Sequence, residues 1–299
     1  MIVRWGRYLG VMYRPSIQLP YSVSWGLGLT ALFACVTGAV ASWRPDAELI
    51  VTVVTLVIMM LLIRAMDDIR DLEYDRRANP GRPLPSGLVR ERDLVTMVAI
   101  GSAVLLLINA NRGAALAMLV VQLVYTFAVV AVERLRGWPH RDRLGLQLAI
   151  NLPILIMLSL YVYLGFLRAE DVRPNAAGFA VVAGATVAAL CMELGRKVTR
   201  TPPEGEKTYV SVLGASGTSL TALGSAVAAL LIVLLALAPW HPGNAWGWLV
   251  LLPLLLPGLA VVRFAAGAAR WPLLPTVGFI PAMYTSFLVV GLLTKGALA

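Results

Sequence analysis

Long apolar stretches dominate this sequence and limit what it can fold into. Each of nine stretches has about the length that a helix needs to cross roughly 30 Å of hydrocarbon. They are residues 21–43, 48–66, 94–110, 113–132, 144–166, 176–194, 212–238, 246–262 and 275–294. Because lipid offers a backbone amide no hydrogen-bond partner, we expect these stretches to be helices. The weak boundaries at residues 109–113 and near Trp246 also allow a count of eight or ten.

The composition excludes a water-soluble domain and a disordered chain. Hydrophobic residues make up 59% of the 299 residues and charged residues 14%, whereas soluble proteins carry about 25% charged residues. Disordered chains are poor in apolar residues. The two cysteines, Cys35 and Cys191, lie in separate apolar stretches and predict no disulfide framework or zinc site. We therefore predict one all-α membrane domain over residues 1–299, a bundle of about nine transmembrane helices.

The distribution of Lys and Arg predicts the orientation in the membrane. With nine spans, 20 of the 25 basic residues fall on the side that carries the N-terminus. Cytoplasmic loops carry an excess of Lys and Arg, so a cytoplasmic N-terminus is expected. The basic residues do not form one stripe, which argues against a nucleic-acid partner. The N-terminal residues do not resemble a transit peptide, which favours the inner (cell) membrane of a prokaryote.

Acidic residues concentrate after the second apolar stretch. Seven of the 16 lie between Asp67 and Asp93. If the second helix continues through them, Asp67, Asp71 and Asp75 recur every four residues on one face, and Asp68 borders that face. Like charges at this spacing repel, so a cation should offset them. Carboxylate oxygens are ligands of Mg²⁺, which often completes its shell with water and phosphate oxygens.

A solvated acidic loop is the alternative interpretation of this string. The arginines that would hold such a loop are Arg64, Arg70, Arg76 and Arg77. Two features favour a metal site instead. Ionisable groups at a membrane helix usually mark a functional path. The prolines of residues 79–87 restrict the backbone, which predicts an ordered loop that holds Arg82 near the carboxylates.

These residues resemble the first signature of the UbiA superfamily of intramembrane prenyltransferases. That signature is an Asn-Asp-x-x-Asp-x-x-x-Asp string after the second helix, followed by an Arg-Pro-Leu-Pro-Ser-Gly-like segment. The string here runs from Asp67 to Asp75, and residues 82–87 provide the segment. Asp67 stands where the family usually has Asn, which keeps an oxygen ligand and adds charge. The resemblance covers essentially the whole chain and implies active-site loops at residues 67–93 and 195–211, facing the cytoplasm.

The family's second signature, two aspartates four residues apart after the sixth helix, is altered here. Glu193 matches the first aspartate, but Lys197 stands at the second position, beside Arg196. The segment resembles a divergent branch in which a Glu-x-x-Arg-Lys string precedes a Thr-Tyr-Ser-like element. We hypothesise that Arg196 and Lys197 contact the diphosphate, since an ammonium can partly replace a metal as a point charge. Glu193 would bind a second Mg²⁺ or orient Lys197. The alternative role for both cations is membrane anchoring.

The resemblance implies Mg²⁺-dependent transfer of an isoprenyl group from a prenyl diphosphate to an aromatic or other lipophilic acceptor. The implied metal ligands are Asp67, Asp68, Asp71, Asp75 and Glu193. The implied catalytic residues are Asp68, Asp71, Asp75, Glu193 and Lys197. The implied diphosphate-binding residues are Arg64, Arg82, Arg134 or Arg136, Arg196, Lys197, Lys207 and Tyr209. The candidates for lining the acceptor or prenyl cavity are Tyr125 and Asn151, whereas His140 is expected to be a solvated loop residue.

Two other functions are consistent with the same sequence. A UbiA-type terpene cyclase would ionise the same diphosphate without an external acceptor. A polytopic transporter would use the acidic cluster to couple cations or phosphate. The apolar stretches are almost free of charges at their centres, whereas transporters place their sites near the bilayer midplane. This distribution favours an enzyme.

Overall fold

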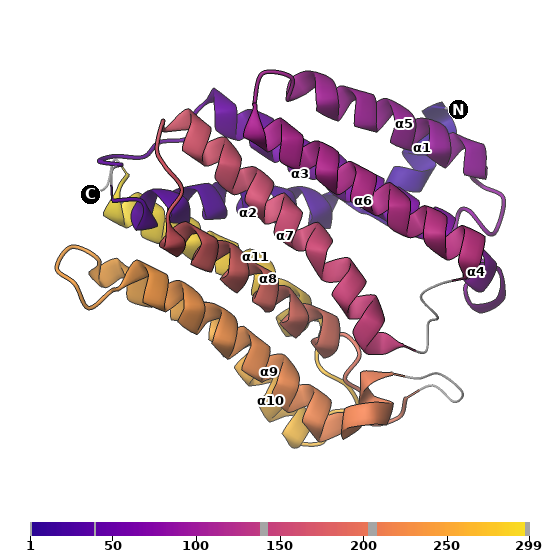
Figure 1. Cartoon of the computed structure of the whole chain (residues 1–299). Coiled ribbons are helices and arrows are strands. Elements are labelled where there is room, and N and C mark those ends of the chain that lie inside the picture. The colour runs from indigo at the N-terminus through magenta and orange to yellow at the C-terminus, as the bar shows by residue number, and fades with distance from the viewer. Residues whose placement is uncertain (1, 39, 138–142, 203–207, 297–299) are drawn as a thin grey trace.

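The computed structural model describes residues 2–38, 40–137, 143–202 and 208–296, and they form a bundle of helices (Figure 1). In chain order the helices are α1 (Ile2–Tyr8), the π-helical turn η1 (Leu9–Tyr13), α2 (Pro15–Val36), α3 (Ala47–Arg70), α4 (Leu72–Ala78), α5 (Glu91–Ile108), α6 (Ala114–Arg136), α7 (Leu144–Ala169), α8 (Ala176–Gly195), α9 (Tyr209–Leu237), the 3-10 helix η2 (Ala245–Leu254), α10 (Leu255–Ala265) and α11 (Leu273–Thr294). Within these ranges the chain forms no strand, and one isolated bridge joins Thr199 to Arg270. The prediction of an all-α membrane bundle is confirmed.

Eight of these helices, with η2 and α10 counted as one, are long and apolar enough to cross a membrane. Helix α5 corresponds to the remaining predicted span, and its 18 residues begin with the charged string Glu91-Arg92-Asp93. The described part of the chain thus contains a helix at each of the nine predicted positions. The N-terminal orientation stays a prediction.

The first membrane helix differs in its bounds from the prediction of residues 21–43. Helix α2 begins at Pro15, because the fixed φ of proline suits the first turn of a helix, and it ends at Val36. Thr37 is extended, and residues 40–43, which were predicted to be helical, lie outside the helix. The amide of Trp43 in this loop donates to the carbonyl of Lys295, 2.7 Å away. The loop therefore joins the start of the bundle to its last helix.

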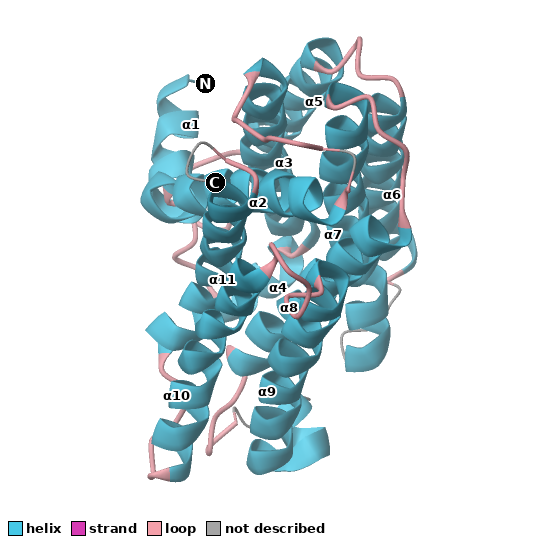
Figure 2. Ribbon diagram, turned by 90° about the vertical axis from the view of Figure 1, so that its left-hand side faces the viewer, coloured by secondary structure: helices cyan, strands magenta, loops and turns pink. Residues whose placement is uncertain are grey.

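The first and last long helices pack closely, which closes the bundle; Figure 2 shows α11 running beside α2. Gly28 of α2 makes this approach possible, because a Cβ atom there would lie 2.2 Å from the carbonyl oxygen of Tyr284. Small residues commonly permit such contacts between membrane helices. The ring of Trp25 stacks on that of Tyr284, with centroids 5.9 Å apart.

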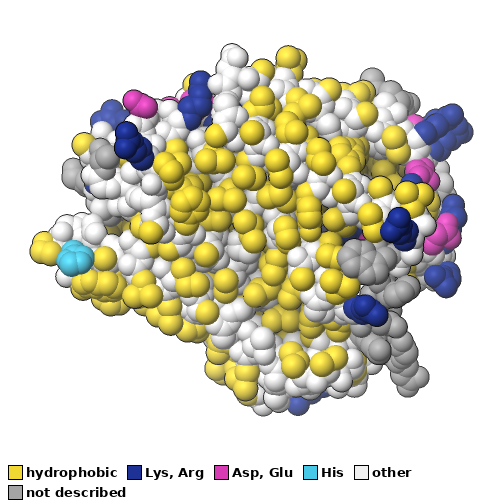
Figure 3. Space-filling model, viewed as in Figure 1, with side chains coloured by type: hydrophobic (Ala, Val, Ile, Leu, Met, Phe, Trp, Pro, Cys, Tyr) yellow, Lys and Arg dark blue, Asp and Glu magenta, His cyan; other side chains and the backbone are white. Residues whose placement is uncertain are grey.

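Charged side chains gather at the right-hand edge and at the upper left of the face in Figure 3, and the surface between them is mainly hydrophobic. Helix α4 lies at the right-hand edge of the same view in Figure 1, beside the end of α6. An apolar band between two charged ends is the surface expected of a membrane-spanning bundle. The start and the end of α3 therefore lie at opposite ends of the bundle, each among its own set of polar groups.

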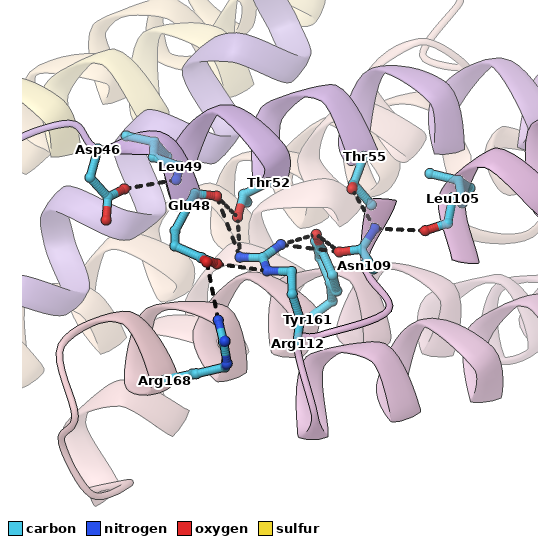
Figure 4. A network of polar contacts seen from close by, with 10 residues as sticks. All are labelled: Asp46, Glu48, Leu49, Thr52, Thr55, Leu105, Asn109, Arg112, Tyr161 and Arg168. Carbon is cyan, nitrogen blue, oxygen red and sulfur yellow. Dashed lines mark hydrogen bonds and ion pairs between the residues drawn. The ribbon is translucent and has the colours of Figure 1, made fainter. Parts of the chain in front are cut away.

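At the first end of α3, a buried arginine joins three parts of the chain (Figure 4). Arg112, in the connection between α5 and α6, is only 4% exposed. Its guanidinium lies 3.1 Å from Glu48 Oε2 and 2.8 Å from Thr52 Oγ1, and it also contacts the Tyr161 hydroxyl of α7. Arg168 contacts Glu48 from the exposed side, at 3.1 Å. Because burying an unpaired charge is costly, this network fixes α3 against α7 and the α5–α6 connection.

We predict that Arg112→Met destabilises the protein much more than Arg168→Met. Removing Arg112 leaves polar partners without their buried cation, which should lower the free energy of unfolding by about 3–5 kcal/mol. Arg168 is 44% exposed, so its loss should cost about 0–1 kcal/mol. Unfolding of both variants in detergent measures the difference, and equal effects would contradict a special role for the buried arginine.

Candidate active site at the α3–α4 junction

The predicted acidic string lies where α3 passes into α4. Helical hydrogen bonding continues across the junction: the amide of Asp71 donates to the carbonyl of Asp67 at 2.8 Å, and that of Asp75 to the carbonyl of Asp71 at 2.9 Å. Asp71, with a ψ of 2°, separates the two helices. Asp68 and Asp75 are buried, while Asp67 and Asp71 are partly exposed. The structure therefore divides the four aspartates into an inner and an outer pair.

Four donors contact the inner pair. The Tyr8 hydroxyl donates to Asp68 Oδ2 at 2.7 Å, and the guanidinium of Arg64 lies 2.5 Å from Asp68 Oδ1. Arg82 contacts Asp75 Oδ2 at 2.6 Å, and the side-chain amide of Asn79 donates to Asp75 Oδ1 at 2.9 Å. All four carboxylate oxygens thus have a partner, which offsets the cost of their burial.

Tyr8 stays protonated at this position. Burial raises its pKa well above the ordinary value, and the negative charge of Asp68 raises it further. The hydroxyl is therefore a donor to the carboxylate throughout the physiological pH range.

Arg70 links the outer pair to α6. Its guanidinium lies 3.1 Å from Asp67 Oδ1, 3.4 Å from Asp71 Oδ1 and 3.4 Å from Glu133 Oε2. Arg70 thus offsets the repulsion between two aspartates that are four residues apart. The contact with Glu133 also brings the end of α6, with Arg134 and Arg136, to the same end of the bundle.

The loop after α4 is ordered, as the sequence predicts. Its backbone folds on itself through hydrogen bonds from Arg82 to Asn79 and from Val89 to Pro83, at 3.0 and 3.1 Å between nitrogen and oxygen. Leu84 and Val89 are buried in the core. Gly87 has a φ of 77°, a conformation that favours glycine. This loop holds Arg82 against Asp75.

The acidic string has the donor chemistry of a magnesium site, but its carboxylates contact cationic groups rather than one another. Among the described residues, no three His, Cys, Asp or Glu side chains converge so that they could hold a metal ion. Carboxylate oxygens are suitable ligands for Mg²⁺, which can take further ligands from water and phosphate. A divalent cation here would compete with Arg64, Arg70 and Arg82. The cation would fit the site when phosphate oxygens, in place of the carboxylates, bind some of these guanidinium groups.

The altered second signature forms a compact cluster at the ends of α8 and α9. Lys197 Nζ lies 2.6 Å from Glu193 Oε1, and Arg196 lies 2.7 Å from Glu193 Oε2. The ammonium of Lys197 also lies 4.9 Å from the ring centroid of Tyr209, a cation–π distance. Glu193 therefore holds both predicted diphosphate-binding cations.

The remaining predicted site residues have different surroundings. Arg134 pairs with Glu91 of α5 at 2.6 Å, and Arg136 is exposed at the end of α6. The Tyr125 hydroxyl donates to the Ile150 carbonyl at 2.9 Å, so it joins α6 to α7. Asn151 is half-buried on α7. Lys207 and His140 lie outside the described residues.

Three residues at this site were not among those predicted from the sequence. No sequence pattern indicated a role for Tyr8, because it lies 60 residues from Asp68 and their contact depends on the tertiary fold. Arg70 was considered only as a partner in a solvated loop, although its position three residues after Asp67 was informative. Asn79 was included only in the ordered loop, and its contact with Asp75 follows the four-residue spacing of a helix.

Comparison with known proteins identifies the fold. No protein-family model matches the sequence, and no curated protein matches it. Several solved structures do match. A UbiA homologue from Aeropyrum pernix K1 is 18% identical, with a TM-score of 0.60 over 92% of this chain and 96% of its own. A UbiA homologue from Archaeoglobus fulgidus, bound to DMAPP and Mg²⁺, is 13% identical, with a TM-score of 0.54 over 97% of this chain and 99% of its own.

A third similar structure is of digeranylgeranylglyceryl phosphate synthase, at 14% identity and a TM-score of 0.53 over 98% of this chain and 99% of that one. The likeness extends over almost the full length of every chain. The protein therefore has the same fold as these UbiA homologues, in agreement with the resemblance noted in the sequence.

We predict that Asp75→Ala loosens the loop at residues 79–90, whereas Glu73→Ala does not. Asp75 is buried and contacts both Asn79 and Arg82 of the loop, so its loss should weaken the loop by about 1–3 kcal/mol. Glu73 lies on the same helix but is exposed, and it pairs with Arg76 of that helix. Hydrogen exchange of the loop amides measures the effect. Unchanged exchange in Asp75→Ala would show that the carboxylate does not order the loop.

Proposed function

We propose that this protein is a Mg²⁺-dependent prenyltransferase of the membrane. It would transfer an isoprenyl group from a prenyl diphosphate to an aromatic or other lipophilic acceptor. The observation that carries the proposal is the set of four aspartates at the α3–α4 junction, with Arg64 and Arg82 in contact, at one end of a helix bundle with the UbiA-superfamily fold. Two solved structures of a UbiA homologue from Archaeoglobus fulgidus, which are similar in fold, hold Mg²⁺ with DMAPP or with GPP.

The aspartates would hold the cation together with the diphosphate. Asp68, Asp71 and Asp75 are the proposed principal ligands, and Asp67 adds a fourth carboxylate. When bound, Mg²⁺ would neutralise the leaving diphosphate as a Lewis acid. Phosphate oxygens would compete with the carboxylates for the nearby guanidinium groups, because both are good bidentate partners of arginine.

The basic residues would then stabilise the leaving group. As the bond between the prenyl C1 and the diphosphate oxygen breaks, its electron pair stays on the diphosphate. Arg64 and Arg82 would compensate the growing charge on that oxygen. The acceptor forms the new bond to C1 and loses a proton. The apolar helices exclude water, which would otherwise capture the allylic cation.

We propose that Lys197 and Arg196 also bind the diphosphate, in place of a second metal site. Only Glu193 matches the carboxylates of the family's second signature, and its oxygens lie 2.6 and 2.7 Å from the two cations. This geometry supports a role for Glu193 in orienting Lys197. Tyr209 supports the ammonium from the other side. Lys207 and either Arg134 or Arg136 would add further positive charge.

The proposed domain organisation follows from the same features. Residues 1–299 would form one membrane-embedded unit, with active-site loops at 67–93 and 195–211. The excess of Lys and Arg on this side supports a site that faces the cytoplasm, in a prokaryotic inner membrane. The lipid-embedded helices would admit the apolar substrates from the bilayer.

We expect the purified protein to release pyrophosphate from a prenyl diphosphate and to prenylate an acceptor, only in the presence of Mg²⁺. Asp68→Asn should lower kcat by about 10²–10³-fold, because it removes a ligand of the Mg²⁺ that would compensate the charge of the leaving group. Glu73→Gln, an exposed change on α4, is the matched control and should keep full activity. Mass spectrometry of the products, with a panel of diphosphates and aromatic acceptors, measures the reaction.

Other products of the same assay would contradict the proposal. A cyclic hydrocarbon formed from the diphosphate alone would identify a terpene cyclase. Uptake into proteoliposomes without cleavage of the diphosphate would identify a transporter.

We expect Lys197→Ala to weaken the binding of a prenyl diphosphate about tenfold or more, because a charge-assisted hydrogen bond contributes about 1.5–3 kcal/mol. Lys197→Arg should retain most of the affinity. Arg76→Ala, which removes an exposed cation at the same end of the bundle, should have no effect. The affinity for a non-reactive thiodiphosphate analogue measures the difference. If Lys197→Ala leaves both affinity and turnover intact, the diphosphate role of Lys197 is wrong.

A further inference from the structure

We propose that Tyr8, on the N-terminal helix α1, is a positioning residue that orients Asp68 and so strengthens the binding of the divalent cation. The inference rests on the proposed function, because it assumes that Asp68 is a metal ligand. It assigns a role to a segment that precedes the first long helix and lies far in sequence from both predicted signatures.

Among the described residues, the side chain of Tyr8 makes one hydrogen bond, and its partner belongs to the candidate site. Its side chain is fully buried, and its hydroxyl donates to Asp68 Oδ2 at 2.7 Å. The other oxygen of Asp68 contacts Arg64. Asp68 is thus held by one neutral and one charged donor, from two different elements.

The rest of the N-terminal segment is fixed in the position that this contact requires; Figure 1 shows α1 close to α5. Arg4 pairs with Asp93 of α5 at 2.8 Å, and the indole of Trp5 donates to the Asp93 carbonyl at 2.9 Å. At the other end, the Tyr13 hydroxyl donates to the Val57 carbonyl of α3 at 2.8 Å. The segment is therefore anchored on both sides of Tyr8.

The backbone of this segment is also unusual. Residues 9–13 form a π-helical turn, and Arg14 has a φ of 45°, in the left-handed region. Such turns and such residues occur often at functional sites, where surrounding contacts maintain them. Here the irregular backbone allows Tyr8 and Tyr13 to reach α3 at two different points.

The two donors of Asp68 differ in what they do when a cation binds. A guanidinium on Asp68 Oδ1 competes with the metal, and a phosphate can draw Arg64 away. The phenol of Tyr8 adds no positive charge, so it can stay on Oδ2 while Oδ1 turns to the metal. A hydrogen bond to the part of a ligating side chain that does not bind the metal fixes the orientation of that side chain. Its loss typically weakens metal binding about 10–100-fold. Tyr8 has this geometry toward Asp68.

The test compares Tyr8→Phe with Tyr13→Phe in the full-length protein. Each variant removes one hydroxyl from the same segment, but only Tyr8 contacts a carboxylate. Binding of Mn²⁺ in the presence of inorganic pyrophosphate is measured by electron paramagnetic resonance. Tyr8→Phe should weaken Mn²⁺ binding about tenfold, as is typical when a hydrogen bond to a metal ligand is lost. Tyr13→Phe should not change the affinity. In the Asp68→Asn background, Tyr8→Phe should have no further effect.

A kinetic measurement separates positioning from a general loss of structure. Tyr8→Phe should raise the Mg²⁺ concentration needed for half-maximal activity, while saturating Mg²⁺ should restore kcat. Unchanged Mn²⁺ affinity in Tyr8→Phe, or an equal loss in Tyr13→Phe, would overturn the inference and leave the proposed function standing. Wild-type protein that does not bind Mn²⁺ with pyrophosphate, or Asp68→Asn protein that binds it normally, would instead overturn the proposed metal site.

A measurement on the wild type tests the same coupling if Tyr8→Phe does not fold. Because coupling between two events is reciprocal, a segment that strengthens cation binding must itself be stabilised by the cation. Hydrogen exchange of residues 2–13 should therefore slow when Mn²⁺ and pyrophosphate are added. Unchanged exchange in this segment would overturn the role of Tyr8.

Discussion

The compensation of buried negative charge at one end of α3 determines much of the structure around the candidate site. Asp68 and Asp75 are buried at this end, and an uncompensated buried carboxylate costs several kcal/mol. The compensating partners come from three directions: Tyr8 from the N-terminal segment, Arg64 from α3 itself, and Arg82 from the loop after α4. The same charges that order these segments are those proposed to bind the cation. Structural and chemical roles are thus coupled at this end of the bundle.

Helix α3 is fixed at both ends by different polar networks. At its start, Glu48 contacts buried Arg112 and exposed Arg168. At its end, the aspartates contact arginines that are partly exposed. The first network has little freedom to change partners because it is enclosed by α7 and the α5–α6 connection. The second network is more open, and under the proposed function its carboxylates would take a metal ion and its arginines a phosphate while the helix stays in place, as a preorganised site requires.

The fold was largely predictable from hydropathy, and the site only in part. Long apolar stretches identified the membrane helices, because the cost of exposing a backbone in lipid is a local property. The contact between Glu193 and Lys197 agrees with one of the two roles that the sequence analysis left open for Glu193, the orientation of Lys197. The contact between Tyr8 and Asp68 was not predictable, since it joins residues 60 positions apart through the tertiary fold. Asp68 and Asp75 are seven residues apart, close to two helical turns, so their common burial agrees with the helical hydrogen bonding that continues across Asp71, whereas the sequence analysis grouped Asp75 with Asp67 and Asp71.

The most direct test of the central claim is an anomalous difference map from crystals of the full chain grown with Mn²⁺ and a non-reactive prenyl thiodiphosphate. The account predicts a manganese peak between the carboxylates of Asp68, Asp71 and Asp75 and the phosphate oxygens. It also predicts that at least one of Arg64 and Arg82 has moved from its carboxylate to the phosphate. A peak elsewhere in the bundle, with the aspartates and arginines still paired with one another, would contradict the account.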